Sequence, residues 1–155
     1  MKYKIYTDGA CSNNGKKNPV GGAAFVVLND EEKIIVEGAF KIEPATNNIC
    51  ELSALIAGCE ALLPFLQIGD KVEVYSDSAY CINAYEQNWI GKWKSNNWLT
   101  SARTPVKNQE LWQQLSKFFM DARFHFSKVK GHTGLCDWNN YVDKKAVAVK
   151  FDNSI

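Results

Sequence analysis

The sequence of 155 residues predicts an α/β domain whose sheet combines an antiparallel hairpin with parallel strands. Segments with strand character alternate with segments of helical periodicity, in the order of three strands, a helix, a strand, two or three helices, a strand and a helix. Helices between strands make crossover connections that join parallel neighbours, whereas a short turn joins antiparallel ones. The chain has no internal repeat and no linker, so we expect a single domain over residues 1–155.

The first three strands follow from composition and turn chemistry. Residues 2–7 form a β-rich run that ends at Asp8, and a polar turn rich in Gly and Asn follows over residues 12–19. Residues 22–28 and 33–42 are predicted to form a hairpin, because the acidic and amide residues between them are typical of a turn.

The first helix is predicted from its apolar spacing and its polar start. Apolar residues recur every three or four positions, at Ile49, Leu52, Ile56, Cys59 and Leu63. Three polar residues are candidates for the cap at its start: Thr46, Asn47 and Asn48.

The second half of the chain supplies the remaining elements. Residues 72–75 form a strand, and a helix follows over residues 78–85. Pro105 is suited to the first turn of another helix, whose apolar residues are Leu111, Trp112, Leu115, Phe118 and Phe119. Residues 124–129 form the last strand and residues 139–149 the last helix.

Composition indicates an ordinary globular protein, with 46% hydrophobic and 23% charged residues. We expect no membrane span, because no apolar run approaches about 18 residues, and no signal peptide. The five cysteines are scattered and contain no C-x-x-C pair: Cys11, Cys50, Cys59, Cys81 and Cys136. This pattern favours a reducing compartment over a disulfide framework or a zinc site. A cytoplasmic monomer is the expectation.

The net charge of +1 conceals an asymmetry along the chain. Residues 88–130 carry eight basic and two acidic side chains, so this segment has a local charge of +6 and the remainder −5. A polyanion could therefore dock on the basic segment while the acidic remainder binds metal.

Four acids stand in distinctive local settings. Asp8 and Asp77 each follow a predicted strand, where open α/β sheets place their ligand crevice, and Glu51 and Asp143 lie on predicted helices. Clustered carboxylates repel one another, and hard divalent cations prefer such oxygen ligands. Taken alone, Asp77 could equally be a helix cap.

The motifs around these acids form an ordered set that spans nearly the whole chain. They are Thr7-Asp8-Gly9-Ala10-Cys11, Thr46-Asn47-Asn48 with Glu51-Leu52, Asp77-Ser78-Ala79-Tyr80, Trp89-Ile90, Pro105-Val106-Lys107-Asn108 with Leu111-Trp112, Lys130-Gly131-His132-Thr133-Gly134, and Asn139 four residues before Asp143. The set resembles the type 1 ribonuclease H family. This resemblance implies a ribonuclease H-like α/β fold, with a five-stranded mixed sheet, an antiparallel three-stranded part and flanking helices. It also implies metal-dependent cleavage of the RNA strand of RNA–DNA hybrids, leaving 5′-phosphate and 3′-hydroxyl ends.

The resemblance assigns roles to particular residues. Asp8, Glu51, Asp77 and Asp143 correspond to the metal-binding carboxylates of a site for two Mg²⁺ ions, with Mn²⁺ as a second option, and two-metal sites hold their ions roughly 3.5–4 Å apart. His132 corresponds to a residue that assists water orientation or product release. We interpret His125, which alternates with aromatic residues in a strand, as structural.

Hybrid-binding residues are also implied by the resemblance. Minor-groove contacts are expected from Asn18, Asn47 and Asn48, and a contact to the hybrid is expected from Cys11, in the loop beside the first acid. Contacts to the DNA strand are expected from a basic protrusion that includes Trp89, Lys92, Trp93, Lys94 and Lys107. A pocket for a DNA phosphate is expected to include Thr46 and Asn108. Each Asn could instead be a turn or cap former, and Trp98 and Trp112 are candidates for the core.

The chain departs from the family pattern at two positions that bear on binding. Ala79 stands where the family commonly has a Gln that contacts the hybrid, and Ile49 replaces a residue that is often basic. An alternative function is therefore a catalytically silent module that binds RNA–DNA hybrids, although silent relatives are expected to lack a carboxylate and none is missing here. A different nuclease or recombinase with this fold, and a domain excised from a reverse transcriptase, are further alternatives.

Overall fold

The computed structural model describes residues 1–12, 19–129 and 137–150. Its five-stranded sheet has the order β3-β2-β1-β4-β5, built from β1 (Lys2–Ser12), β2 (Val20–Leu28), β3 (Ile34–Ile42), β4 (Lys71–Ser76) and β5 (Phe124–Lys128). The strand β2 pairs antiparallel with β1 and with β3, whereas β4 pairs parallel with β1 and β5 pairs parallel with β4. The mixed sheet with an antiparallel three-stranded part is confirmed.

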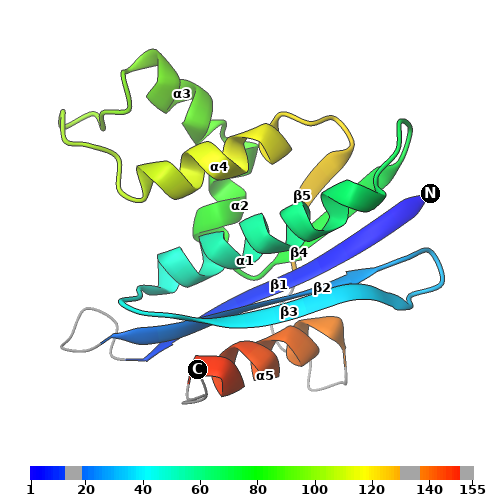
Figure 1. The fold of residues 1–155 in the computed structure, drawn as a ribbon. Coiled ribbons are helices and arrows are strands. Elements are labelled where there is room, and N and C mark those ends of the chain that lie inside the picture. Colours follow the sequence, from blue (N-terminus) through cyan, green and yellow to red (C-terminus); the bar gives the residue numbers. More distant parts are fainter. Residues whose placement is uncertain (13–18, 130–136, 151–155) are drawn as a thin grey trace.

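Helices cover both faces of the sheet. They are α1 (Asn47–Leu62), which continues into the 3₁₀ turn η1 (Leu63–Phe65), and then α2 (Ala79–Glu86), α3 (Trp89–Ser95), α4 (Gln109–Phe119) and α5 (Trp138–Lys150). Figure 1 shows α1 on one face with α2, α3 and α4 beyond it, and α5 alone on the other face. Apolar side chains fill both interfaces, so each face of the sheet has its own core.

The helix α1 begins where the sequence predicts. Thr46 is its N-cap, because Thr46 Oγ1 accepts a hydrogen bond from the Ile49 backbone N–H at 3.1 Å. Of the three candidates, Asn47 and Asn48 therefore lie inside the first turn, where their side chains are exposed. This cap fixes the start of the helix that carries Glu51.

The same helix is longer and more apolar than we expected of any segment from the sequence. Segment Asn47–Phe65 has 19 residues and is long and apolar enough to cross a bilayer by length and composition. Half of its apolar window is buried inside the fold, and α1 packs on β1 and β2. Its apolar character is thus that of a helix in the domain core.

Two boundaries differ from the prediction for identifiable reasons. The strand β1 continues past Asp8 to Ser12 because its antiparallel pairing with β2 extends to Val20. The helix α4 begins at Gln109 rather than at Pro105, because Pro105 forms a bridge with Leu99 in a segment that folds back on itself. An additional short helix, α3, opens at Asn88, whose left-handed backbone (φ 54°) turns the chain out of α2.

Candidate active site

The parallel pairing of β1 with β4 brings two of the acids together. Tyr6 pairs with Tyr75 in the last register position of these strands, and Thr7 Oγ1 donates a hydrogen bond to the Tyr75 carbonyl at 3.0 Å. Asp8 and Asp77 each lie two residues beyond that pair. They therefore occupy matching positions just beyond the parallel pairing of β1 with β4, at the edge where open α/β sheets place their ligands.

Gly9 brings the third acid into the same place. A side chain at Gly9 would collide with the backbone of Cys50 and Glu51, so the first turn of α1 lies directly on β1. The Gly9 backbone N–H donates a hydrogen bond to the Glu51 carboxylate. One carboxylate oxygen from each of Asp8, Glu51 and Asp77 lies within 4.8 Å of the others.

The fourth acid reaches the cluster from the opposite face. Asp143, on α5, shares a side-chain hydrogen bond with the Asp8 carboxyl. All four acids predicted from the sequence therefore converge, from β1, α1, the turn after β4 and α5, which lie far apart along the chain.

Asp77 does not cap the helix that follows it. Ser78 is the N-cap of α2, and its side chain accepts a hydrogen bond from the Cys81 backbone N–H at 3.2 Å. The Ser78 backbone N–H in turn donates to Ser76 Oγ at 3.1 Å. Because the hydroxyls of Ser76 and Ser78 accept these backbone hydrogen bonds, the Asp77 carboxylate is left to face Asp8 and Glu51.

Burial and mutual repulsion make ionisation of this cluster unfavourable. Asp8 is 3% exposed, and burial, followed by the hydrogen bond to Asp143 and the charge of Glu51, raises its pKa to about 10. Burial and then the charge of Asp77 raise the pKa of Glu51 to about 8. Glu51 Oε2 is enclosed without a hydrogen-bond partner. A buried acceptor without a partner, within a group of repelling carboxylates, fits a divalent cation as its missing ligand.

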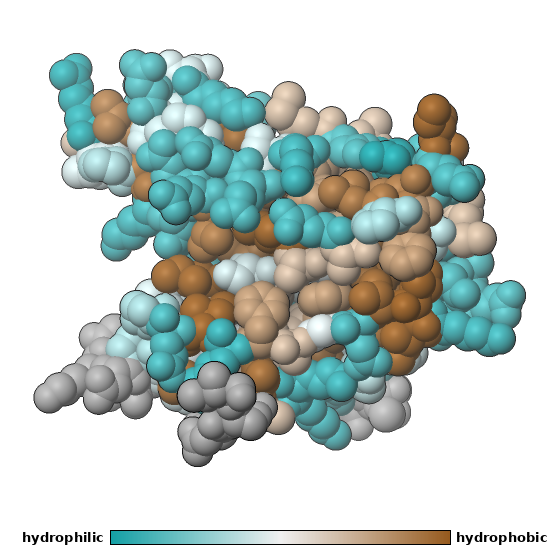
Figure 2. Space-filling view, in the orientation of Figure 1, coloured by the Kyte–Doolittle hydropathy of each residue, from teal (hydrophilic) through white to brown (hydrophobic). Residues whose placement is uncertain are grey.

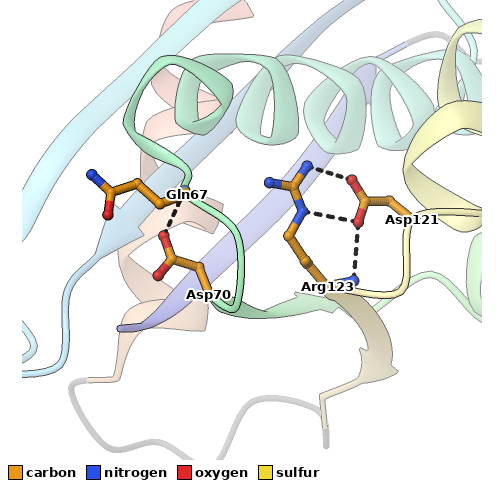
Figure 3. Close-up of polar contacts among 4 residues, drawn as sticks. All are labelled: Gln67, Asp70, Asp121 and Arg123. Atoms are coloured by element: carbon orange, nitrogen blue, oxygen red, sulfur yellow. Dashed lines mark hydrogen bonds and ion pairs between the residues drawn. The ribbon is translucent and has the colours of Figure 1, made fainter.

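Asp70 and Asp121, at the opposite end of β4 and β5, are carboxylates with hydrogen-bond donors and make a contrast with the cluster (Figure 3). The Gln67 backbone N–H donates to Asp70 at 2.8 Å, and the N-terminal ammonium lies 3.0 Å from the same carboxylate. Arg123 donates to both oxygens of Asp121, at 3.0 and 2.7 Å. These donors lower the pKa of Asp70 and of Asp121, whereas Asp8 and Glu51 have raised pKa values.

The residues predicted to bind a hybrid lie in several places around the cluster. Thr46, Asn47 and Asn48 are exposed at the start of α1, and Cys11 is partly exposed on β1, three residues beyond Asp8. Two of the predicted residues, Asn18 and His132, lie outside the described residues.

The predicted protrusion is built on packed indole rings. The ring centroids of Trp93 lie 6.0 Å from Trp89, 6.1 Å from Trp98 and 5.4 Å from Trp112, which is fully buried. A groove of about 470 Å³ is lined by Trp89, Lys92, Trp93, Asn96, Leu99, Thr100 and Ser101. Figure 2 shows that hydrophilic residues cover most of this part of the surface.

Other basic and amide residues of the prediction lie outside this groove. Lys94 projects toward α4, where its Nζ donates to Ser116 Oγ at 3.0 Å, and Lys107 is exposed. Asn108 lines a separate pocket of about 550 Å³ together with Ile49, and Glu110 lies in the same pocket. Without a basic side chain in its lining, this pocket would hold a phosphate by neutral donors alone.

His125 lies away from the cluster, in agreement with a structural interpretation. Its Nδ1 is 3.3 Å from Glu73 Oε2, and its ring contacts Tyr85 edge to face.

Comparisons with known proteins agree with this architecture. A sequence model of the RNase H family matches residues 1–150. A protein named Ribonuclease H from Clostridium botulinum (strain Hall) is 44% identical over 145 residues, which cover 94% of this chain and 93% of the relative. Another Ribonuclease H, from Caldicellulosiruptor saccharolyticus, is 46% identical over 138 residues, covering 86% of this chain and 89% of the relative.

Solved structures show the same fold at lower identity. The foamy viral protease-reverse transcriptase in complex with an RNA/DNA hybrid matches with a TM-score of 0.81 and 19% identity, over 96% of this chain and 20% of that one. The N-terminal RNase H domain of a Mycobacterium tuberculosis protein matches with a TM-score of 0.71 and 22% identity, over 97% and 94% of the two chains. With the family match over residues 1–150, these findings place the chain in the RNase H family of nucleases.

Proposed function

We propose that this chain is an endoribonuclease that hydrolyses the RNA strand of RNA–DNA hybrids, with two Mg²⁺ ions held by Asp8, Glu51, Asp77 and Asp143. The observation that carries the proposal is the convergence of four acids in a partly enclosed cluster, with three of their oxygens within 4.8 Å of one another. The ancestry of the chain and the RNA/DNA hybrid in a structural relative support the choice of substrate.

The four carboxylates suit such ions in charge as well as in chemistry. Four negative charges balance two divalent cations, so an incoming phosphate is not repelled. Bound there, the ions would activate a water and stabilise the leaving 3′-oxygen. The chain's own contribution is to hold the four carboxylates in place: Asp8 on β1, Glu51 on α1, Asp77 between β4 and α2, and Asp143 on α5.

Selectivity for a hybrid is proposed to come from residues around the cluster. Asn47 and Asn48 are exposed in the first turn of α1, about one helical turn before Glu51. Amide side chains can bond the 2′-hydroxyl that distinguishes RNA from DNA. Asn18 and Cys11 would extend these contacts, and Thr46 and Asn108 would meet the DNA phosphate. His132 would assist the orientation of the water or the release of product.

We also propose a monomeric, cytoplasmic, single-domain protein. The free thiols at four described cysteines suit a reducing compartment.

The protrusion is proposed to bind the DNA strand through Lys92, Lys94 and Lys107 with Trp89 and Trp93. Replacing Lys92, which lines the groove, with Gln is expected to weaken hybrid binding and to reduce the slope of log affinity against log salt by about 0.9, the value for one phosphate contact. The affinity is measured by fluorescence anisotropy from low to high salt in chelator. Lys33→Gln, which changes an exposed lysine paired with Glu31, is the control. An unchanged slope in Lys92→Gln would contradict the proposed contact.

The proposed activity is tested with four labelled substrates of one sequence: an RNA–DNA hybrid, double-stranded RNA, double-stranded DNA and single-stranded RNA. Each is incubated with the protein in Mg²⁺ and in chelator, and products are separated on a gel. Cleavage of the RNA strand of the hybrid alone, only with metal, is expected. Tight hybrid binding without cleavage would instead favour the silent module, and cleavage of all duplexes would favour a nuclease of another specificity.

A further inference from the structure

The helix α5 lies on the face of the sheet opposite to all other helices (Figure 1). Val142 and Ala146 form its buried stripe and pack on a small core of Ala24, Val26 and Leu28. Gly22 leaves room for the backbone of Ala146, so α5 approaches β2 closely. Its start is capped, because Asp137 Oδ1 accepts a hydrogen bond from the Asn140 N–H at 2.8 Å.

Helical geometry places a cluster acid on one side of that buried stripe and two polar side chains that contact β3 on the other. Successive residues are rotated by about 100°, so Asp143 lies on one flank of the stripe, and Tyr141 and Lys145 lie on the other. Asp143 reaches Asp8 on β1. Tyr141 and Lys145 reach Glu37 on β3, two strands away from β1.

Glu37 is the centre of a compact polar cluster, which we call the Glu37 clamp: Glu37, Tyr141 and Lys145. Tyr141 Oη donates to Glu37 Oε1 at 2.7 Å, and Lys145 Nζ lies 3.0 Å from the same oxygen. Lys145 Nζ is also 4.9 Å from the centre of the Tyr141 ring. The side chains of Glu37 and Lys145 are only 33% and 38% exposed, so the contact is partly shielded from water. Two contacts thus tie one flank of α5 to the edge of the sheet, and the contact of Lys145 with the Tyr141 ring holds the two helix side chains together.

The register of the sheet links this clamp to the acids. Tyr6, Val26 and Glu37 occupy one row across β1, β2 and β3, and Asp8, Ala24 and Ala39 occupy the row two residues away. The helix therefore bridges Asp8 at one side and Glu37 at the other, with Ala24 and Val26 of β2 between them.

The apolar contact of Val142 and Ala146 with the sheet is non-directional, so it opposes rotation of the helix about its axis less than a directional hydrogen bond does. A side chain about 5–6 Å from that axis moves by about 1 Å when the helix turns by about 10°. Displacement of a ligand by about 1 Å can cost a catalytic site about 100-fold in rate. We propose that Glu37 is a positioning residue, which acts through Tyr141 and Lys145 to set the rotation of α5 and hence the place of Asp143 beside Asp8. This inference rests on the proposed metal site.

The test compares Glu37→Ala with the control Glu32→Gln, which breaks the ion pair of Lys4 with Glu32 on the hairpin loop. In Glu37→Ala we expect the half-saturating Mg²⁺ concentration for cleavage to rise about tenfold. The affinity for Mn²⁺ without substrate, measured by calorimetry, should fall by a similar factor. Hybrid affinity in chelator should not change, because the clamp touches none of the proposed hybrid-binding residues. Glu32→Gln should match the wild-type protein in all three measurements.

A charge exchange separates positioning from a general loss of stability. Glu37→Lys is expected to behave like Glu37→Ala, and the double variant Glu37→Lys with Lys145→Glu should recover most of the Mn²⁺ affinity, because it restores the ion pair in reverse. Wild-type Mn²⁺ affinity in Glu37→Ala, or a double variant no better than Glu37→Lys, would overturn the proposal. A wild-type protein that binds Mn²⁺ but cleaves no hybrid would refute the proposed function and leave the clamp to be judged by Mn²⁺ affinity alone.

Discussion

Replacement of Asp8 with Asn is expected to abolish hybrid cleavage while hybrid binding persists. Asp8 is 3% exposed and interacts with each of the other three acids, so it would be a ligand of the proposed metal site. Asn keeps the size of the side chain but removes its charge. Metal ions supply several kcal/mol of charge stabilisation in the transition state, so the loss should be at least about 10³-fold in the single-turnover rate.

The matched control for this variant is Asp70→Asn. Asp70 is also buried, but its partners are the chain terminus and Gln67 at the other end of the sheet (Figure 3). Activity per folded molecule should be retained in this control, and hybrid affinity in chelator should be retained in both variants. Near wild-type cleavage by Asp8→Asn would refute the assignment of the metal ligands.

The stability of the metal-free protein is expected to fall as pH rises. The folded chain holds protons on Asp8 and Glu51, with pKa values of about 10 and about 8, whereas the unfolded chain ionises near its ordinary pKa values of 3.8 and 4.5. Above about pH 4.5 the folded state therefore binds more protons than the unfolded state, and the free energy of unfolding decreases with pH. For one carboxyl the decrease approaches roughly 4 kcal/mol between pH 5 and pH 8.

Urea unfolding at pH 5, 6, 7 and 8 in chelator measures this dependence. Glu51→Gln removes one of the titrating groups, so the difference between wild type and this variant isolates its contribution from that of other residues. The variant should have the flatter profile and be the more stable protein at pH 8. Saturating Mg²⁺ should stabilise the wild type more at pH 8 than at pH 6, since binding requires ionised ligands. Parallel profiles for the two proteins in chelator would contradict the raised pKa of Glu51.

Much of the fold could be predicted because its signals are local. Short segments of sequence indicate the cap at Thr46, the apolar stripe of α1 and the order of strands and helices. The meeting of Asp8 with Asp77 could be anticipated from the rule that ligands bind at the carboxyl ends of parallel strands. The place of Gly9 beneath α1 had no comparable signal, because a close approach of backbones depends on how the helix packs.

The sequence could not predict in which direction individual side chains project, nor which residues they contact. Lys94 and Lys92 are two residues apart on α3, so they project to different sides, and only Lys92 lines the groove with Trp89. Pro105 was suited to a helix start, yet its bridge to Leu99, six residues earlier, extends the preceding segment. The contacts of Glu37 with α5 join residues 104 positions apart, and nothing in either segment alone indicates them.

The most direct test of the proposed metal site is to locate its ions. Crystals of the Asp77→Asn variant with an uncleaved RNA–DNA hybrid, grown with Mn²⁺, would give anomalous difference peaks at the metal positions. We expect Mn²⁺ beside Asp8, Glu51 and Asp143 at the scissile phosphate of the RNA strand, with two ions roughly 3.5–4 Å apart where both are retained. A hybrid bound elsewhere, or an acid cluster without any anomalous peak at saturating Mn²⁺, would contradict a metal-dependent mechanism at these four residues.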